Sequence, residues 1–235
     1  MSGWKAKRFW SQAAAEACAG GFTVRLDSRA VKTPAKAALV LPNFSMAQAC
    51  ADEWNAQHGV IKPETMPMTR YANSAIDKVA HHRIEVAAIV SAYGETDLLC
   101  YRATDPEGLI ARQAIGWNPH LAWAAAELSA PLNVTQGVTP IDQPTESIAR
   151  LHGLTAALTP FQLAAFHDLV AITGSLILGF CLAKRRLSPD EAFAISRIDE
   201  HWQVELWGKD EDAADLETLK NAALARAHRF FGLCG

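Results

Sequence analysis

Three residue types that a hydrolase needs occur close together in one segment of the chain. His167 and Asp168 are adjacent, and Ser175 follows within Thr173-Gly174-Ser175. A hydrolytic triad requires a nucleophile, a base that contacts it and an acid that orients the base. Neighbouring helical residues do not face each other, and Ser175 lacks the G-x-S-x-G turn that exposes a nucleophile. We therefore expect no triad here, and we interpret Gly174 and Ser175 as small residues that allow close helix packing.

The chain also lacks the spacings on which common cofactor and metal sites depend. It contains neither G-x-x-x-x-G-K-[ST] nor a G-x-G-x-x-G motif after a strand, so nothing local predicts nucleotide binding. The eight histidines form no H-E-x-x-H pair, and the five cysteines form no C-x-x-C pair. The sequence predicts a protein that is not an enzyme and that holds no cofactor and no metal.

Composition excludes several classes of partner. The net charge is -3, from 22 basic and 25 acidic residues, which predicts no binding to nucleic acid or anionic lipid. The uncharged run 169–183 would span only about 22 Å of a ~30 Å hydrocarbon core, so we expect a buried helix and no membrane insertion. Scattered cysteines and an amino terminus without a secretory signal favour a bacterial-type cytoplasm.

The first part of the chain is expected to form a small antiparallel sheet and one helix. Alternating apolar and polar residues, with a turn at 27–29, predict the sheet. Its strands are expected at 7–10, 22–26, 30–33 and 38–41. Ser45 is expected to cap the helix, which should end at Gly59 and place Trp54 in the core.

Helices dominate the remainder. Pro63 and Pro67 interrupt regular structure and place the predicted boundary between domains 1–65 and 66–235. Helices are expected at 70–92, 107–127, 144–157, 160–184, 188–207 and 211–231, with a short extended piece near 132–138. The fold class is therefore α+β, with a small amino-terminal antiparallel β domain followed by a larger all-helical carboxyl-terminal domain.

The helix expected at 188–207 has two different faces. An apolar stripe at steps of three or four should pack against the helical domain; its members are Ala192, Ile195, Ile198, Trp202 and Leu206. The opposite face presents Arg197, Asp199, Glu200 and Gln203 outward, and Trp207 could lie on the surface. Such a face is either simply solvated or a binding surface.

Several longer strings extend in order from about residue 7 to the carboxyl end. They are Gly21-Phe22-x-Val24-x-Leu26-Asp27-x-Arg29-x-Val31-Lys32-Thr33-Pro34, Glu53-Trp54, Thr69-Arg70-x-Ala72-Asn73-Ser74-Ala75-Ile76-Asp77, Thr96-Asp97-Leu98-Leu99-Cys100-Tyr101-Arg102, Trp117-Asn118-Pro119, Thr173-Gly174-Ser175-Leu176 and Asp199-Glu200-x-Trp202-Gln203-x-Glu205-x-Trp207-Gly208. Together they closely resemble the assembly-chaperone family that binds the alpha subunit of the F-type ATP synthase, found in mitochondria and alphaproteobacteria.

This resemblance implies a function. Members bind a free alpha subunit and cover its beta-facing surface until assembly, without ATP of their own, in the mitochondrial matrix or the bacterial cytoplasm. We expect a monomer whose partner is the alpha subunit. The position of Glu200 in the last of these strings makes it the leading client-binding residue, followed by Asp199, Glu205, Trp207 and Gln203. Structural roles are expected for Trp54, Gly174 and Asp97.

Two other classes of function stay open at this point. One is a small cytoplasmic hydrolase or transferase whose site is built from distant residues, and the other is a structural subunit of the synthase itself. A deep polar pocket with strongly shifted pKa values would favour an enzyme. A surface patch that mixes aromatic side chains with Glu200 would favour a binding protein.

Overall fold

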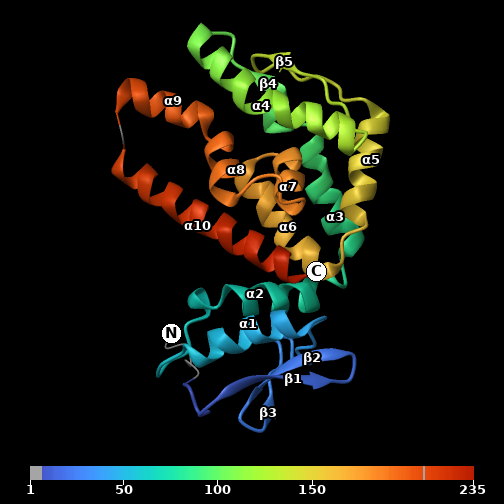
Figure 1. Cartoon of the computed structure of the whole chain (residues 1–235), viewed down its shortest axis with the longest axis vertical. Coiled ribbons are helices and arrows are strands. Elements are labelled where there is room, and N and C mark those ends of the chain that lie inside the picture. The colour runs from blue at the N-terminus through green and yellow to red at the C-terminus, as the bar shows by residue number, and fades with distance from the viewer. Residues whose placement is uncertain (1–6, 209) are drawn as a thin grey trace. The chain divides into compact units, whose positions relative to one another are not determined.

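The computed structural model describes residues 7–208 and 210–235, and the chain forms two compact units (Figure 1). The first comprises residues 1–82, 159–164 and 229–235, and the second comprises 83–158 and 165–228. Residues 1–6, on which the prediction of no secretory signal partly rests, lie outside the described residues. The predicted boundary between a β-rich domain 1–65 and an α-helical domain 66–235 stays a prediction.

The first unit contains the predicted small antiparallel sheet. Its order is β1 (Ala13–Cys18), β2 (Gly21–Leu26) and β3 (Arg29–Ala30). Asp27 closes the turn after β2 with φ 52°, and its carboxylate accepts hydrogen bonds from the backbone N–H groups of Ser11 and Gln12. β1 was not predicted individually because its alanine-rich sequence has little strand preference.

Two of the predicted strands are only isolated bridges. Lys7 pairs with Val60, and Leu41 pairs with Phe22, so the predictions of strands at 7–10 and 38–41 are wrong. Segment 7–10 has one bridged residue, and segment 38–41 has two separate ones, because Ala38 also pairs with Lys32. Backbone hydrogen bonds still hold both segments, such as the 2.7 Å bonds from the Arg8 N–H to the Gly59 carbonyl and from the Leu41 N–H to the Phe22 carbonyl.

Helix α1 (Phe44–Asn55) packs on this sheet and begins earlier than predicted. Asn43, not Ser45, is the N-cap, and its side-chain oxygen accepts from the Met46 N–H at 2.9 Å. Both residue types cap well, so the sequence did not decide between them. Trp54 is half-buried and packs edge-to-face against Trp10, with ring centroids 5.2 Å apart.

The helix predicted at 70–92 is divided. The observed elements are η1 (Pro63–Thr65), α2 (Pro67–Ser74), the π-helical η2 (Ala75–Val79) and α3 (Arg83–Ser91). Pro67 suits the first position of α2, because no intrahelical bond needs its missing N–H.

The second unit is almost entirely helical, which confirms the α+β class. Its elements are α3, η3 (Ala92–Gly94), η4 (Leu98–Cys100), β4 (Tyr101–Arg102), α4 (Glu107–Glu127), β5 (Thr135–Gln136), α5 (Thr145–Ala156), α6 (Pro160–Thr173) from residue 165, α7 (Leu176–Ala183), α8 (Pro189–Ser196), α9 (Ile198–Trp207) and α10 (Glu211–Leu233) to residue 228. The short strands β4 and β5 pair in parallel. Within the described part of the chain, no helix is both long and apolar enough to cross a membrane.

The helices predicted at 160–184 and 188–207 are each two helices. Gly174 has φ +69° and ends α6, after which Ser175 caps α7 by accepting from the Leu178 N–H at 3.0 Å. Gly174 therefore supplies a left-handed backbone and not, as predicted, close helix packing. Arg197, with φ −116° and ψ 20°, separates α8 from α9. Because α9 has its own axis, Leu206 leaves the predicted buried stripe and is 58% exposed.

Gly179 on α7 allows α6 and α7 to lie close together. A Cβ atom there would lie 2.5 Å from Val170 Cγ2 and 3.4 Å from the Phe166 ring, both on α6. Real Cβ atoms do not approach so closely, and a β-branched valine has little freedom to move aside. The α6–α7 contact therefore requires a residue without a side chain at this position.

We predict opposite effects for two glycine substitutions in helices of the second unit. Gly179→Ala should lower the free energy of unfolding by about 1–3 kcal/mol, because overpacking outweighs the gain in helix propensity. Gly153→Ala is the matched control, because a Cβ there meets nothing within 4 Å; it should raise stability by up to about 1 kcal/mol. Urea denaturation of both variants measures the difference, and equal effects would contradict the packing argument.

Candidate functional site

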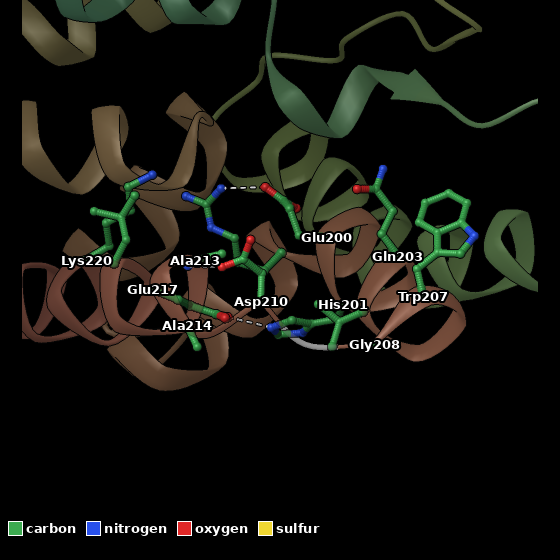
Figure 2. Close-up of a pocket in the computed structure, with 13 residues that line it drawn as sticks. Glu200, His201, Gln203, Trp207, Gly208, Asp210, Ala213, Ala214, Glu217 and Lys220 are labelled. Atoms are coloured by element: carbon green, nitrogen blue, oxygen red, sulfur yellow. Dashed lines mark hydrogen bonds and ion pairs between the residues drawn. The ribbon is translucent and has the colours of Figure 1, made fainter.

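A groove of about 430 Å³ lies between α9 and the first half of α10, within the second unit (Figure 2). Its described lining consists of Arg197, Glu200, His201, Gln203, Val204, Trp207, Gly208, Asp210, Ala213, Ala214, Leu216, Glu217 and Lys220. It mixes aliphatic and aromatic side chains with charges of both signs. Trp207 and Arg197 are of residue types that protein interfaces contain more often than other surfaces do.

One face of α9 forms a wall of this groove. Gln203 and Val204 lie three and four residues after Glu200, Trp207 lies four and three residues after them, and all four line the groove. Trp207 is 78% exposed and Val204 is 41% exposed. The structure thus brings together three residues predicted for client binding, namely Glu200, Gln203 and Trp207.

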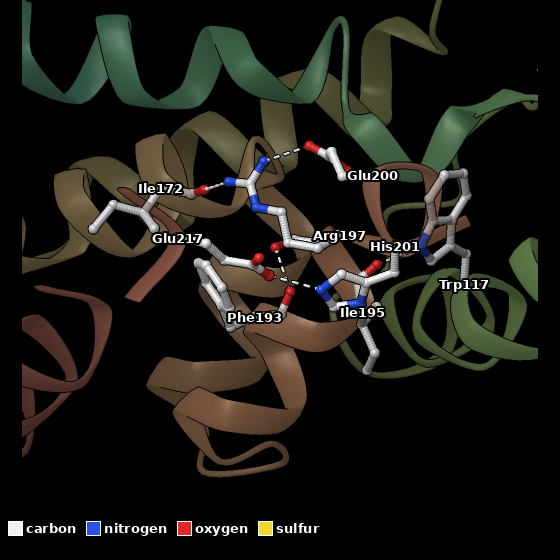
Figure 3. Close-up of polar contacts among 9 residues, drawn as sticks. Trp117, Ile172, Phe193, Ile195, Arg197, Glu200, His201 and Glu217 are labelled. Carbon is white, nitrogen blue, oxygen red and sulfur yellow. Dashed lines mark hydrogen bonds and ion pairs between the residues drawn. The ribbon is translucent and has the colours of Figure 1, made fainter. Parts of the chain in front are cut away.

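Arg197 lies at the base of this wall and is held from two sides (Figure 3). One terminal nitrogen donates to Glu200 Oε1 at 2.7 Å, and the other donates to the Ile172 carbonyl at 2.6 Å. Arg197 was predicted to face outward, but only 18% of its side chain is exposed, because the break between α8 and α9 turns it toward α6. The Glu200 side chain remains 53% exposed.

Two groove residues that the sequence did not single out connect α9 to α10. His201 Nε2 and Glu217 Oε1 lie 2.7 Å apart, as drawn in Figure 3. Asp210 caps α10 by accepting from the Ala213 N–H at 3.1 Å. Only the return of α10 alongside α9 creates the His201–Glu217 contact. No spacing in the sequence signals that return, although the acidic start of α10 does signal a helix amino terminus.

Asp199 and Glu205, also predicted for client binding, do not line the groove. Asp199 accepts from the Gln113 amide at 2.7 Å, and Glu205 forms a bidentate pair with Arg112 at 2.6 and 2.9 Å. The Arg112 guanidinium holds the pKa of Glu205 below its usual value. Both acids therefore face α4 and help to fix α9 against it.

Close packing supports the same contact between α4 and α9. A Cβ atom at Gly108 would lie 2.8 Å from the Trp202 ring, and one at Gly116 would lie 2.5 Å from Ile198 Cδ1. The Arg112 guanidinium also lies 4.9 Å from the Trp202 ring centroid. One face of α9 is thus structural, and its opposite face is free to bind.

The residues considered for a hydrolytic triad do not form one. His167 Nδ1 contacts Asp168 Oδ1 at 2.9 Å, although neighbouring helical residues were not expected to meet. Ser175 is fully buried, and its hydroxyl donates to Asp97 at 2.7 Å while it accepts from the Leu178 N–H. The Ser175 hydroxyl is therefore a helix cap and is not exposed as a nucleophile.

Asp97 is the fully buried partner of this cap. Its oxygens also accept from the N–H groups of Leu99 and Ile177, each at 3.0 Å. Burial raises the pKa of Asp97 to about 6, against the lowering effect of these donors. Asp97 does not line the groove. Its shifted pKa is therefore explained by a structural role.

The described residues offer no metal site. Across 7–208 and 210–235, no three His, Cys, Asp or Glu side chains are grouped so that they could hold a metal ion. The lining of the groove offers apolar contact, hydrogen bonds and charge for recognition.

Comparison with known proteins gives consistent matches. The model of a family described as "ATP12 chaperone protein" matches residues 7–125. The crystal structure of Atp12 from Paracoccus denitrificans is 47% identical, with a TM-score of 0.96 over 99% of this chain and 100% of that chain. A solved Agrobacterium tumefaciens protein is 39% identical, with a TM-score of 0.92 over 96% of this chain and 85% of that chain. Mitochondrial protein atp12 of Schizosaccharomyces pombe is 28% identical over 94% of this chain and 81% of its own length.

The raised pKa of Asp97 predicts a specific pH dependence of stability. Between about pH 4 and pH 6 the folded protein keeps a proton on Asp97 that the unfolded chain has released, so this carboxyl lowers stability as pH rises. Asp97→Asn removes that titration and, at higher pH, costs about 1–3 kcal/mol because its amide N–H₂ faces backbone donors.

Urea denaturation of the natural chain and of Asp97→Asn at a series of pH values isolates this contribution. The difference in the free energy of unfolding, natural chain minus variant, should fall between about pH 4 and pH 6 and be flat above that range. A difference that rises with pH would mean that the hydrogen bonds, and not burial, dominate the pKa of Asp97.

Proposed function

The chain belongs to the ATP12 chaperone family of ATP synthase assembly factors, and from this premise we propose that it holds the free alpha subunit of the F-type ATP synthase. In this proposal it covers the beta-facing interface of that subunit until the catalytic head assembles. An unassembled subunit exposes an apolar surface that is prone to aggregate, and a transient partner prevents this. We place this activity in a bacterial-type cytoplasm, with the chaperone as a monomer.

The observation that carries the proposal is the composition of the α9–α10 groove. Trp207, Val204 and Leu216 expose apolar surface beside the carboxylate of Glu200. Tryptophan is among the residue types that dominate interface hot spots. Asp199 and Glu205 are assigned a supporting role, because their bonds to α4 orient the binding face of α9.

The Arg197–Glu200 pair suits a chaperone that must release its client. Because Glu200 is 53% exposed, its pairing with Arg197 is worth no more than about 1 kcal/mol. A cation on the client can therefore compete for Glu200 at little cost. Arg197 keeps its bond to the Ile172 carbonyl, so this exchange leaves the base of the groove in place.

The enzyme alternative lacks a comparable observation. His167, Asp168 and Ser175 do not assemble, and the Asp97 carboxylate is occupied by buried donors. A structural subunit is separable by experiment, because it would co-purify with the finished synthase in fixed ratio. A chaperone would be found with the free alpha subunit and not with the finished complex.

We predict that Glu200→Lys leaves the fold intact but weakens capture of purified alpha subunit by about tenfold or more, since reversing an interfacial charge replaces attraction by repulsion. Glu200→Gln should have a smaller effect in the same direction. Glu127→Lys is the control, because this exposed residue ends α4 and does not line the groove. Immobilised variants and titrated alpha subunit give the affinities, and urea denaturation checks the fold.

Unchanged affinity for Glu200→Lys would remove Glu200 from the site. Failure of the natural chain to bind alpha subunit at all, under conditions in which that subunit is soluble, would overturn the proposed function itself.

A further inference from the structure

The sheet of the first unit has an open edge along β1. This strand pairs with β2 over its full length, and no other strand of the described residues lies beside it. A sheet edge carries backbone N–H and C=O groups without partners, and folded proteins usually block it with lysine, proline or a bulge. The pairing of β1 has no bulge, and its sequence, Ala-Ala-Ala-Glu-Ala-Cys, has neither lysine nor proline. Its one charged residue is Glu16.

Asn55 shows how this edge binds an amide group. Its Nδ2 donates to the Ala13 carbonyl and its Oδ1 accepts from the Ala13 N–H, each at 2.7 Å. A residue of a neighbouring strand would form the same pair of bonds. Bonding direction alternates along a strand, so the N–H and C=O groups of Ala15 and Ala17 point the same way as those of Ala13. No described residue bonds to them, so the edge is closed at Ala13 and open at Ala15 and Ala17.

The open residues belong to the apolar face of the sheet. Ala15 and Ala17 lie opposite Val24 and Phe22 of β2, and Val24 is fully buried. The Phe22 ring packs edge-to-face against Phe44 of α1, with centroids 5.8 Å apart, so this is the face that packs on α1. A strand added at the edge would extend this face, and we expect its side chains there to be apolar.

Glu16 gives the edge a charge preference on the opposite face. Its side chain is 49% exposed and lies 3.5 Å from Arg25, and such an exposed pair is weak enough for Glu16 to contact a second cation. Two copies of this chain that paired Ala15 with Ala17 of the second copy would place their Glu16 residues directly opposite each other. Like charges in that position are destabilising. The edge therefore suits a different chain, with Lys or Arg opposite Glu16.

We propose that the open edge of β1 adds an extended segment of the client as a further strand, with a basic residue opposite Glu16 and apolar residues on the α1 face. This inference rests on the proposed function and gives the client a second contact, on the first unit of the chaperone. In strand addition, main-chain hydrogen bonds supply affinity and alternate side chains supply specificity. Ala15 and Ala17 supply the former, and Glu16 supplies the latter.

The first test is the affinity of full-length variants for purified alpha subunit. Ala15→Pro removes an outward N–H, and edge strands tolerate proline where the N–H faces solvent. Its affinity should fall by about fivefold or more, because backbone bonds to the added strand are lost. Ala30→Pro is the matched control at the other edge: the Val31 N–H donates to the Val24 carbonyl, so the N–H of the exposed Ala30 points away from β2. Its affinity should stay unchanged.

A second variant leaves the backbone of β1 unaltered. Glu16→Lys should weaken binding of alpha subunit by about threefold or more, because repulsion replaces attraction opposite the client's cation. Glu127→Lys, the same charge reversal at an exposed residue of α4, should leave affinity unchanged. Urea denaturation checks that each variant is folded.

Hydrogen exchange of the natural chain reads the edge directly and requires no variant. The Ala15 and Ala17 amides should exchange rapidly in the free chain and at least about tenfold more slowly in the complex with alpha subunit, because each then donates to the added strand. The Ala14 and Glu16 amides point toward β2 and should already be protected in the free chain.

The outcomes separate this inference from the proposed function. If the natural chain binds alpha subunit but Ala15 and Ala17 gain no protection, the inference fails and the proposed function stands. If these amides become protected in the chain alone as its concentration rises, a second copy occupies the edge, which also overturns the inference. If the natural chain does not bind alpha subunit, the proposed function fails, and the inference falls with it because its added strand belongs to that client.

Discussion

The buried carboxylate of Asp97 is the interaction on which the arrangement of the second unit depends. It joins η4 to the amino terminus of α7 through Ser175 and the Ile177 N–H. The hydroxyl that it orients also caps α7, so one carboxylate satisfies groups that would otherwise be buried without partners. Burying this carboxylate removes its charge from water, which is unfavourable and raises the pKa of Asp97 to about 6.

A series of close contacts along α7, α8 and α9 connects the surroundings of Asp97 to the groove. α7 packs on α6 at Gly179, and α8 begins at a capping box formed by Ser188 and Glu191. The Trp117 indole on α4 donates to the Ile195 carbonyl near the end of α8 at 2.9 Å (Figure 3). α9 then starts at Arg197, whose guanidinium is held by the Ile172 carbonyl of α6. These contacts position the base of the groove, and the His201–Glu217 contact joins its two walls, α9 and α10.

α9 illustrates how one short helix can serve structure and recognition at once. Trp202, Asp199 and Glu205 turn toward α4, where glycines allow the Trp202 ring to approach. The residues on the opposite face of α9, including Glu200, Val204 and Trp207, line the groove and are exposed. This division matters for interpreting variants, because neighbouring acids in one motif differ in role: loss of Glu205 removes a link to α4, whereas loss of Glu200 changes the groove.

The sequence by itself determined the α+β class, the bounds of α4 to within a residue, the capping box of α8 and the resemblance that led to the family. These features depend on local patterns such as periodicity, caps and ordered motifs. The resemblance also brought Glu200, Gln203 and Trp207 forward for client binding, but it did not separate them from Asp199 and Glu205. Only the tertiary structure decided that Gly174 and Arg197 break helices, because burial of neighbouring groups and not local preference selects those backbone angles. It also decided that Asp199 and Glu205 meet α4 and that His201 meets Glu217, because such pairings join residues far apart in sequence and leave no trace in local spacing.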